Sequence, residues 1–205
     1  MGFVNLPGNI DLAVKGNLLF ADSYVDLVWF DITQPAQPAV AGRLEHAFPD
    51  VLPPSDNYYL MTELDASKGV VIGWKVKTIT EKRPHDIYCP GCLYQNDGAS
   101  FGAEGGSSGV AGMTGSMSRF AVHGDYLYAV TDFMLKVFAL SGNDVTKGGE
   151  QYLNWNTETI FAYDQKLFLG TTSGLLIYDI ANPAVPEYLS SLNHVLGCDP
   201  VVVQG

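Results

Sequence analysis

Gly174-Leu-Leu-Ile-Tyr-Asp-Ile-Ala-Asn-Pro183 is the stretch that decides how this chain folds, because its pattern occurs twice. Asp26-Leu-Val-Trp-Phe-Asp-Ile-Thr-Gln-Pro35 has the same pattern and begins 148 residues earlier. Each copy holds β-formers in a run too short for a helix. The proline that follows cannot donate to a sheet, so the strand ends before it. The chain is therefore predicted to consist of repeated β units that stack on one another.

The repeats can be aligned on the short strand that opens each unit. By this alignment residues 12–17, 120–125, 161–166 and 201–205 open successive units, in steps of 108, 41 and 40 residues. The third unit is predicted to contain strands at 160–163, 167–171, 175–180 and 187–192. A small residue, Ala13, Ala121 or Ala162, lies in the middle of three opening strands, which suits the crowded axis of a propeller. Four strands in about forty residues are typical of a propeller blade.

The predicted fold class is therefore all-β, with propeller blades of four antiparallel strands. Three blades and one strand cannot close a ring, which needs at least about four blades. We expect residues 1–205 to form a single partial propeller domain of a longer chain, with a ring shared between subunits as the alternative. The open edges of such a domain would be sites of association.

The quoted stretches, each followed by Asn/Gln-Pro-Ala, resemble the LVIVD repeat of bacterial and archaeal surface proteins. The resemblance covers roughly residues 10–48 and 118–205. The middle unit departs from it, since Val137-Phe-Ala-Leu-Ser-Gly142 lacks both the Asp and the Pro. The resemblance implies a β-propeller of exported or lipid-anchored proteins, and no established activity. It places the chain outside the cytoplasm, in the periplasm or at the cell surface, with any lipid anchor on a segment absent from this sequence.

The long first step holds an insertion, residues 49–117. Residues 58–62 and 70–79 predict a β-hairpin with its turn at 65–69, with Trp74 and Val76 facing inward and Lys75 and Lys77 facing outward. The Gly-rich run 98–115 lacks the Gly-Lys-Ser/Thr ending of a phosphate-binding loop, so we interpret it as a flexible or closely packed loop.

Cys89 and Cys92 are separated by Pro-Gly, which indicates a turn. A disulfide within this loop is the favoured hypothesis, and it requires an oxidising compartment. A zinc site with His85 and a fourth ligand, a redox pair and two plain thiols are the alternatives. The sequence does not determine the state of Cys198.

The formal net charge of −11 argues against nucleic-acid binding, which needs clustered Lys and Arg. No apolar run has the length of a membrane span, so no transmembrane segment is predicted. We expect no cofactor and a partner of unknown identity, a protein or a glycan of the envelope.

Some residues that could be catalytic recur with the repeat, which favours structural roles. His46 and His194 lie 148 residues apart, like the motif itself. Asp31 and Asp179 end equivalent strands, where an Asp can accept hydrogen bonds from the following turn.

The best geometric candidate for a site is the lip where the innermost strands begin. Polar residues at these starts would converge around a channel and could bind a ligand or an ion; they are Asn9, Asp11, Ser118, Arg119, Glu158, Thr159 and Asp199. The alternative interpretation is that these are ordinary polar strand ends.

Two functions of different class fit these features. The first is a non-enzymatic binding or scaffold propeller, because the sequence has neither a Gly-x-Ser-x-Gly nor a His-Glu-x-x-His motif. The second is a hydrolase or lyase whose acid and base groups lie at the lip, with Glu158, Asp199 and Arg119 as candidates and the insertion as a lid.

Overall fold

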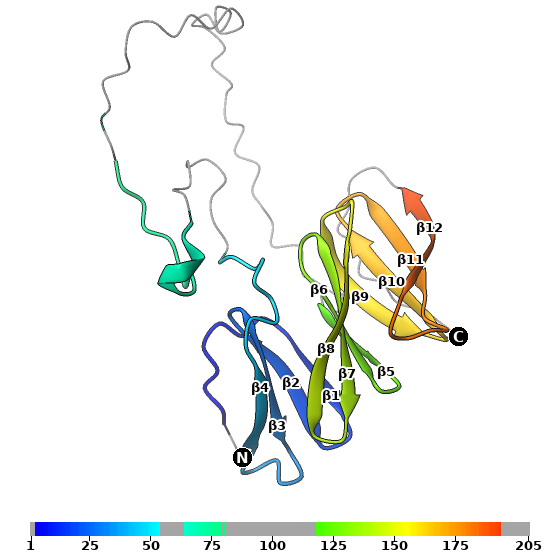
Figure 1. Ribbon diagram of the computed structural model, residues 1–205, viewed down its shortest axis with the longest axis horizontal. Coiled ribbons are helices and arrows are strands. Elements are labelled where there is room, and N and C mark those ends of the chain that lie inside the picture. Colours follow the sequence, from blue (N-terminus) through cyan, green and yellow to red (C-terminus); the bar gives the residue numbers. More distant parts are fainter. Residues whose placement is uncertain (1–2, 54–63, 79, 81–117, 194–205) are drawn as a thin grey trace, which may run out of the picture. The chain divides into compact units, whose positions relative to one another are not determined.

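The computed structural model describes residues 3–53, 64–78, 80 and 118–193. Three four-stranded antiparallel sheets make up the fold, and in each of them the strands follow sequence order (Figure 1). The N-terminal sheet holds β1 (Leu12–Lys15), β2 (Leu18–Ser23), β3 (Asp26–Asp31) and β4 (Ala39–Leu44). The middle sheet holds β5 (Phe120–His123), β6 (Tyr126–Val130), β7 (Met134–Ser141) and β8 (Asp144–Tyr152). The C-terminal sheet holds β9 (Thr157–Tyr163), β10 (Lys166–Thr171), β11 (Gly174–Asp179) and β12 (Glu187–Asn193). The all-β prediction is thus confirmed, and so are four strands for the third unit.

The strand register corrects the predicted alignment of the third unit by one residue. The first hairpin of the middle sheet pairs His123 with Tyr126, and that of the C-terminal sheet pairs Tyr163 with Lys166. Equivalent positions in these two sheets are therefore 40 residues apart, and not 41. Phe161, and not Ala162, is the counterpart of Ala121, so the expectation of a small residue there was wrong for the third unit. The larger side chain fits because this face of the C-terminal sheet has no neighbouring sheet in the described part of the chain.

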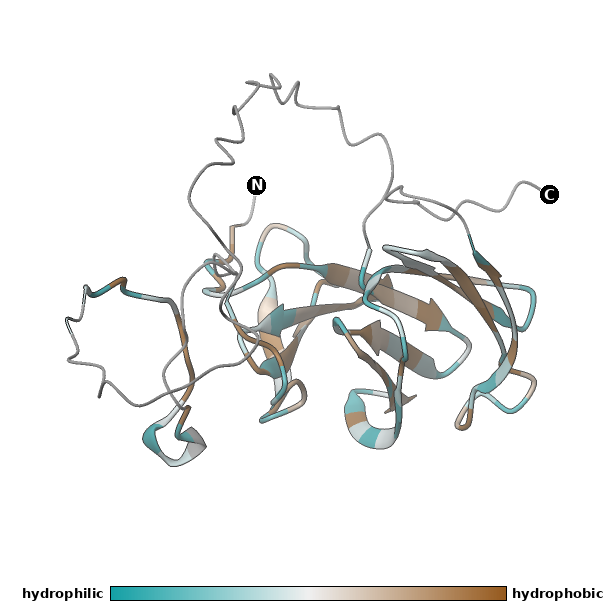
Figure 2. Ribbon diagram, turned by 90° about the horizontal axis from the view of Figure 1, so that it is seen from above, coloured by the Kyte–Doolittle hydropathy of each residue, from teal (hydrophilic) through white to brown (hydrophobic). Residues whose placement is uncertain are grey.

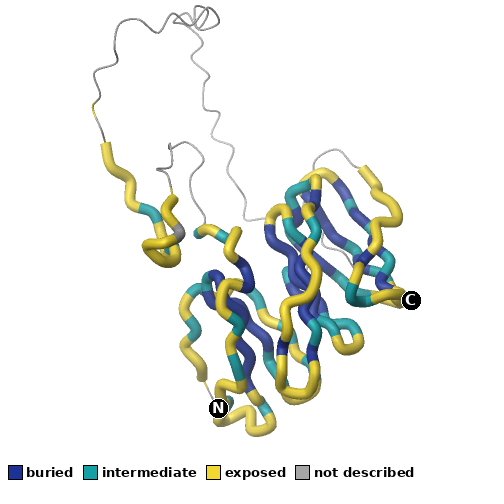
Figure 3. Tube along the Cα trace, viewed as in Figure 1, coloured by how far each residue is buried: buried dark blue, intermediate teal, exposed yellow. Residues whose placement is uncertain are grey.

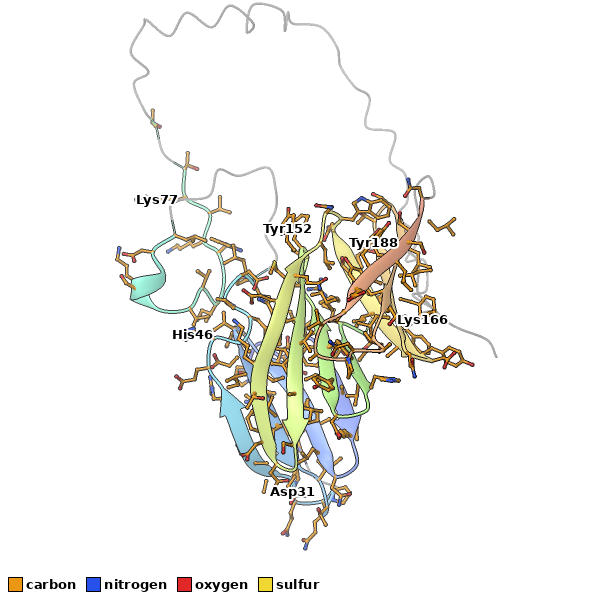
Figure 4. All side chains as sticks on the ribbon, turned by 45° about the vertical axis from the view of Figure 1, so that its right-hand side comes forward. Asp31, His46, Lys77, Tyr152, Lys166 and Tyr188 are labelled. Atoms are coloured by element: carbon orange, nitrogen blue, oxygen red, sulfur yellow. The ribbon has the colours of Figure 1, made fainter. Side chains whose placement is uncertain are left out.

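The predicted role of the two strand-ending aspartates is confirmed. Asp31 Oδ1 accepts a hydrogen bond from the backbone N–H of Thr33, and Asp179 Oδ1 accepts one from Ala181, both at 2.7 Å. Hydrogen bonds from the side chain and backbone of Thr33 hold the pKa of Asp31 below its ordinary value. Asp31 lies at the end of the N-terminal sheet opposite His46, far from the strand starts (Figure 4).

The three sheets stack through their first strands, since β5 contacts both β1 and β9. A core between the N-terminal and middle sheets contains Phe20, Trp29, Phe48, Phe120 and Phe138. A second core between the middle and C-terminal sheets is formed mainly by Tyr128, Leu135, Val137, Leu169, Leu176 and Tyr178. Figure 3 shows the buried residues concentrated along the strands that meet at these cores.

Both sheet junctions are also joined by an aromatic donor. Trp29 Nε1–H donates to the backbone oxygen of Asn143 at 2.8 Å, and the Tyr128 hydroxyl donates to that of Pro183 at the same distance. The two acceptors are 40 residues apart, so they occupy equivalent turns of the middle and C-terminal sheets. Trp29 can lie flat on β4 because Gly42 is its neighbour, where an added Cβ would be 2.2 Å from the indole ring.

The C-terminal sheet keeps one apolar face outside these cores. Phe161, Phe168, Leu175 and Ile177 alternate with the core residues of β9 to β11 and are only half-buried. Leu192 on β12 pairs with Leu175 and is 65% exposed. The hydropathy colouring shows hydrophobic residues along the strands of this sheet (Figure 2).

The chain divides into one compact unit that contains all three sheets, residues 1–74 and 114–205, and a second unit, residues 75–113. A short 3₁₀ helix, Ala66–Lys68, stands at the predicted turn. Residues 70–78 form no strand, contrary to expectation, and Val76 is exposed like Lys75 and Lys77. The other predicted hairpin strand, 58–62, and the Gly-rich run 98–115 lie outside the described residues and stay predictions, but the strand that the hairpin needs at 70–78 is absent.

Candidate functional site

Asp11 joins the strand starts of the N-terminal and middle sheets. Its Oδ2 accepts hydrogen bonds from the backbone N–H groups of Arg119 and Phe120, at 2.5 and 2.8 Å, and from the Ser118 hydroxyl at 3.1 Å. The structure thus brings Asp11, Ser118 and Arg119 together, and ligand binding by these residues stays a prediction. A carboxylate with three donors is tightly engaged, which gives Asp11 the role of a junction between two strands.

Asp22 fixes the segment that leads into β1. Its Oδ1 accepts hydrogen bonds from Asn9 Nδ2, Ile10 N and Asp11 N, at 2.8, 2.8 and 2.9 Å. Burial raises the pKa of Asp22 above its ordinary value, although the backbone N–H groups of Asp11 and Ile10 oppose this rise. Asn9, the first predicted lip residue, is therefore held in place by Asp22, which the sequence analysis did not single out.

The start of β9 meets the start of β5 through a backbone carbonyl. Ser118 O accepts hydrogen bonds from Ile160 N at 2.8 Å and from the Thr159 hydroxyl at 3.2 Å. Glu158 precedes Thr159 on β9 and is half-buried. The guanidinium of Arg119 lies 3.5 Å from Asp132 Oδ1 in an ion pair. The predicted residues of the middle and C-terminal sheets therefore also lie next to one another.

The predicted lip residue Asp199 and the proposed disulfide pair Cys89 and Cys92 lie outside the described residues, and both predictions stay open. Cys198, for which the sequence made no prediction, also lies outside them.

A small hollow lies between the first two sheets at the lip. Asp11, Asp22, Arg119 and Thr131 contribute its polar wall, and Phe48 and Phe120 contribute to its apolar wall. Its volume of about 20 Å³ is that of a water site. A space of this size between engaged polar groups suits a bridging water better than a substrate.

Lys136 is a buried cation that sequence analysis missed. Its side chain is 3% exposed, and its Nζ lies 2.8 Å from Asp50 Oδ1 and 3.4 Å from Glu150 Oε2. The Thr131 hydroxyl donates to Asp50 Oδ2 at 2.6 Å. Burial alone would raise the pKa of Asp50, but the hydrogen bonds from Lys136 and Thr131 outweigh it and hold this pKa below its ordinary value. The cluster ties the segment after β4 to the middle sheet.

The strand register shows why Lys136 is unusual. Its counterparts are Val28 in the N-terminal sheet and Leu176 in the C-terminal sheet, both buried. A charged residue between Leu135 and Val137 in a strand motif is the one sequence signal that could have revealed the cluster.

The carboxylate of Asp26 holds the chain in place at the end of β4. Asp26 accepts hydrogen bonds from Arg43 Nε at 2.7 Å and from the His46 backbone N–H at 2.8 Å, and it also contacts the other guanidinium nitrogen of Arg43. His46 has a positive φ of 52°, and its amide belongs to this turn. The geometry agrees with the structural role predicted for His46.

In the parts of the chain that the structure describes, no group of three or more His, Cys, Asp or Glu side chains could hold a metal ion. Over the same residues, no helix has the length and apolar character needed to cross a membrane.

Residues 9–45 match the family model described as the LVIVD repeat. This match contains the whole N-terminal sheet, from β1 to β4, and it confirms the resemblance predicted from residues 26–35. A search of curated proteins finds no match to this chain.

Proposed function

We propose that the three sheets are successive blades of a β-propeller and that this propeller is a non-enzymatic binding or scaffold domain of the cell surface or envelope. One observation carries the fold: the middle sheet packs one face on the preceding sheet and the opposite face on the following sheet. Stacking of this kind, through the first strands of four-stranded sheets, is how propeller blades assemble. The LVIVD match over the first sheet supports the same assignment.

The apolar outer face of the C-terminal sheet supports a larger ring. Phe161, Phe168, Leu175 and Ile177 stand at positions whose counterparts in the middle sheet are buried by the next sheet. Further blades, in a longer chain or in another subunit, would bury this face in the same way. Residues 1–205 would then be one partial propeller domain, and residues 49–117 its insertion.

The engagement of the lip carboxylates supports binding over catalysis. Asp11 and Asp22 each accept three hydrogen bonds from protein donors, which fixes both carboxylates in the strand junctions. In each carboxylate the three donors share one oxygen, which gives that oxygen a structural role, whereas a general base must present a free lone pair to its substrate. A surface-exposed domain that recognises an envelope protein or glycan fits the lip better.

Protease treatment of intact cells tests the location of the domain. The product of the full reading frame, carrying a tag inside residues 98–115, is expected to lose that tag when protease is added to whole cells if the domain lies at the cell surface, and only after the outer membrane is permeabilised if it lies in the periplasm. A cytoplasmic marker must remain intact in the same sample. Recovery of the tagged product with the cytoplasmic fraction would refute a surface function.

The alternative function is a propeller hydrolase or lyase with its site at the lip. Glu158, Asp199 and Arg119 are the residues that would supply acid, base and charge stabilisation. Screening the full product on hydrolase and lyase substrates, with Glu158→Gln and Asp199→Asn as matched variants, separates the two functions. Turnover that both variants abolish would favour the enzyme, and turnover unchanged in both would remove the lip mechanism.

A further inference from the structure

An apolar pocket opens beside the strand starts of the N-terminal sheet, apart from the small polar hollow. Its volume is about 210 Å³. Three segments far apart in sequence line it: Gly8 to Ile10 before β1, Val51 to Pro53 after β4, and Val71 with Ile72 in the insertion. Tyr24, from the turn between β2 and β3, contributes an aromatic wall.

Specific contacts hold these walls in place. Trp74 Nε1–H donates to the backbone oxygen of Pro53 at 2.8 Å, which ties the insertion segment to the one after β4. Tyr24 N–H donates to Gly8 O at 3.3 Å, and an added Cβ on Gly8 would lie 2.5 Å from the Tyr24 ring. Gly8, with φ of 73°, and Tyr24, with φ of 57°, both have left-handed backbones. Glycine adopts this conformation without strain, whereas tyrosine does so rarely, and strained non-glycine residues are frequent at ligand sites.

The size and lining of the pocket restrict its ligand. An apolar cavity of about 150 Å³ holds benzene in a protein interior, so 210 Å³ accommodates one aromatic ring or a small fused ring. The aromatic wall of Tyr24 favours a ring over an aliphatic chain, because offset or edge contacts between rings add to the burial energy.

The carboxylates beside the pocket disfavour an anionic ligand. Asn9, on its wall, donates to the Asp22 carboxylate, and the small hollow that contains Asp11 and Asp22 shares Ile10, Tyr24 and Val51 with the pocket. A carboxylate on the ligand would therefore stand near two carboxylates of the protein, in a chain with a net charge of −11.

We propose that this pocket binds an uncharged aromatic ring, the size of benzene to indole. This inference rests on the proposed binding function, and it specifies the chemical class of ligand that the domain binds in this pocket. A free aromatic compound and an aromatic side chain of a partner share this chemistry.

Indole is the probe for the pocket. Titration into the ¹⁵N-labelled chain is expected to shift the indole N–H signal of Trp74 in a saturable manner, because its acceptor Pro53 lines the pocket. The signals of Trp29 and Trp155, which belong to the sheet cores, are expected to stay in place. Trp74→Phe identifies the signal. Indole-3-carboxylate is expected to bind at least tenfold more weakly.

Two pocket variants and one control complete the test. Leu52→Trp adds a side chain that fills the pocket. Ile72→Ser removes an apolar side chain from the pocket wall, and because Ile72 is 70% exposed, the substitution does not endanger the folding of the chain. Each is expected to weaken indole binding at least tenfold. Val40→Ser, at an exposed residue of β4 outside the pocket, is expected to leave it unchanged.

A Trp74 signal that does not shift, or indole affinity that survives Ile72→Ser, overturns the proposal. So does equal affinity for indole-3-carboxylate. A short uncharged peptide with a single Trp distinguishes the sources: binding as tight as indole assigns the site to a partner side chain, and failure of the peptide alone assigns it to a free compound. Surface exposure of the full product is measured separately, so the pocket and the surface function can fail independently.

Discussion

The middle and C-terminal sheets have the same strand order and equivalent turns, but they differ in burial. In the middle sheet, β6 and β7 are buried on both faces, from Leu127 to Val130 and from Leu135 to Phe138. In the C-terminal sheet, β11 alternates between buried and half-buried residues, because among the described residues only the face with Leu176 and Tyr178 meets another sheet.

The two sheets share an apolar composition on both faces, and they differ in how many of those faces another sheet covers. An isolated antiparallel sheet with one solvated face normally alternates apolar and polar residues. The outer face of the C-terminal sheet instead carries Phe161, Phe168, Leu175 and Ile177, a composition suited to burial on both sides. A face of this composition is one that a further sheet would bury, which is the arrangement that the propeller proposal requires.

The largest expected effect is at Leu135 of the middle sheet, compared with its counterpart Leu175 in the C-terminal sheet. Leu135→Ala should destabilise the chain by about 3 kcal/mol, because Leu135 is 0% exposed and its loss leaves a cavity. Leu175→Ala should cost about 1 kcal/mol or less, because its side chain is only half-buried. Denaturant unfolding of both variants measures the difference.

The same pair of variants sharpens the comparison when placed in the product of the full reading frame. If a further sheet covers the C-terminal sheet there, the cost of Leu175→Ala should rise toward that of Leu135→Ala. Equal costs in the 205-residue chain would contradict the difference in burial described above.

The second prediction concerns Lys136, where the middle sheet has a cation and the C-terminal sheet has Leu176. Asp50→Asn should destabilise the chain by about 2 to 3 kcal/mol, because it leaves the buried ammonium with only the more distant Glu150 as a charged partner. Lys136→Leu, which copies the C-terminal sheet, should be nearly neutral, because the partly exposed Asp50 can regain water.

Chemical denaturation of the two single variants and of the double variant gives the coupling between Asp50 and Lys136. Glu150→Gln is the control, since Glu150 is more exposed and farther from Lys136, and should cost less than about 1 kcal/mol. A stability loss from Lys136→Leu that exceeds the loss from Asp50→Asn would contradict this account.

The four-stranded antiparallel sheets could be predicted from the sequence because the signals that define their strands are local and repeated. The Asp-Ile-x-Asn/Gln-Pro pattern marks where β3 and β11 end, and the structure gives Asp31 and Asp179 the same hydrogen bond to the next turn. The third unit was misaligned by one residue because Ala162 follows Phe161, which imitates Phe120-Ala121. The turn at Asp164-Gln165, which has positive φ without glycine, fixes the true register.

The site was predictable only in outline. The strand starts converge as expected, since antiparallel strands in stacked sheets must bring equivalent ends together, and Asp11, Ser118 and Arg119 meet there. The partners of these residues depend on contacts across more than a hundred residues of sequence, which no local pattern specifies. Asp22 and Asp50 were missed for another reason, because neither lies in a repeated motif: the donors to Asp22 are only 11 to 13 residues away, and Asp50 contacts Thr131 and Lys136 of the middle sheet. Residues 70–78, whose alternation suggested a strand, form none.

The two sheet junctions differ in strength at the strand starts. Asp11→Ala removes a carboxylate with three hydrogen bonds between β1 and β5, and should cost about 2 kcal/mol. Thr159→Val removes one hydroxyl bond to Ser118 O, while Ile160 N still donates to that oxygen, and should cost about 1 kcal/mol. Thermal unfolding compares the two variants. If Thr159→Val costs more than Asp11→Ala, the carboxylate junction is not the stronger one.

The smallest expected effect is the pH dependence of the Asp50 cluster, which has no counterpart in the C-terminal sheet. Hydrogen bonds from Lys136 and Thr131 outweigh burial and lower the pKa of Asp50 below 3.8, its value in the unfolded chain. A carboxyl group with a lower pKa in the folded state stabilises that state above the unfolded pKa, and this stabilisation is lost as pH falls through the folded value. The stability difference between the native chain and Asp50→Asn should thus be constant from pH 7 to about 5 and shrink below about 4. Both proteins share the opposite trend of Asp22, whose pKa is raised by burial, so it cancels in the difference. A difference that stays constant down to pH 3 would mean that Asp50 contributes through its shape and hydrogen bonds alone, and that the buried Lys136 does not depend on its charge.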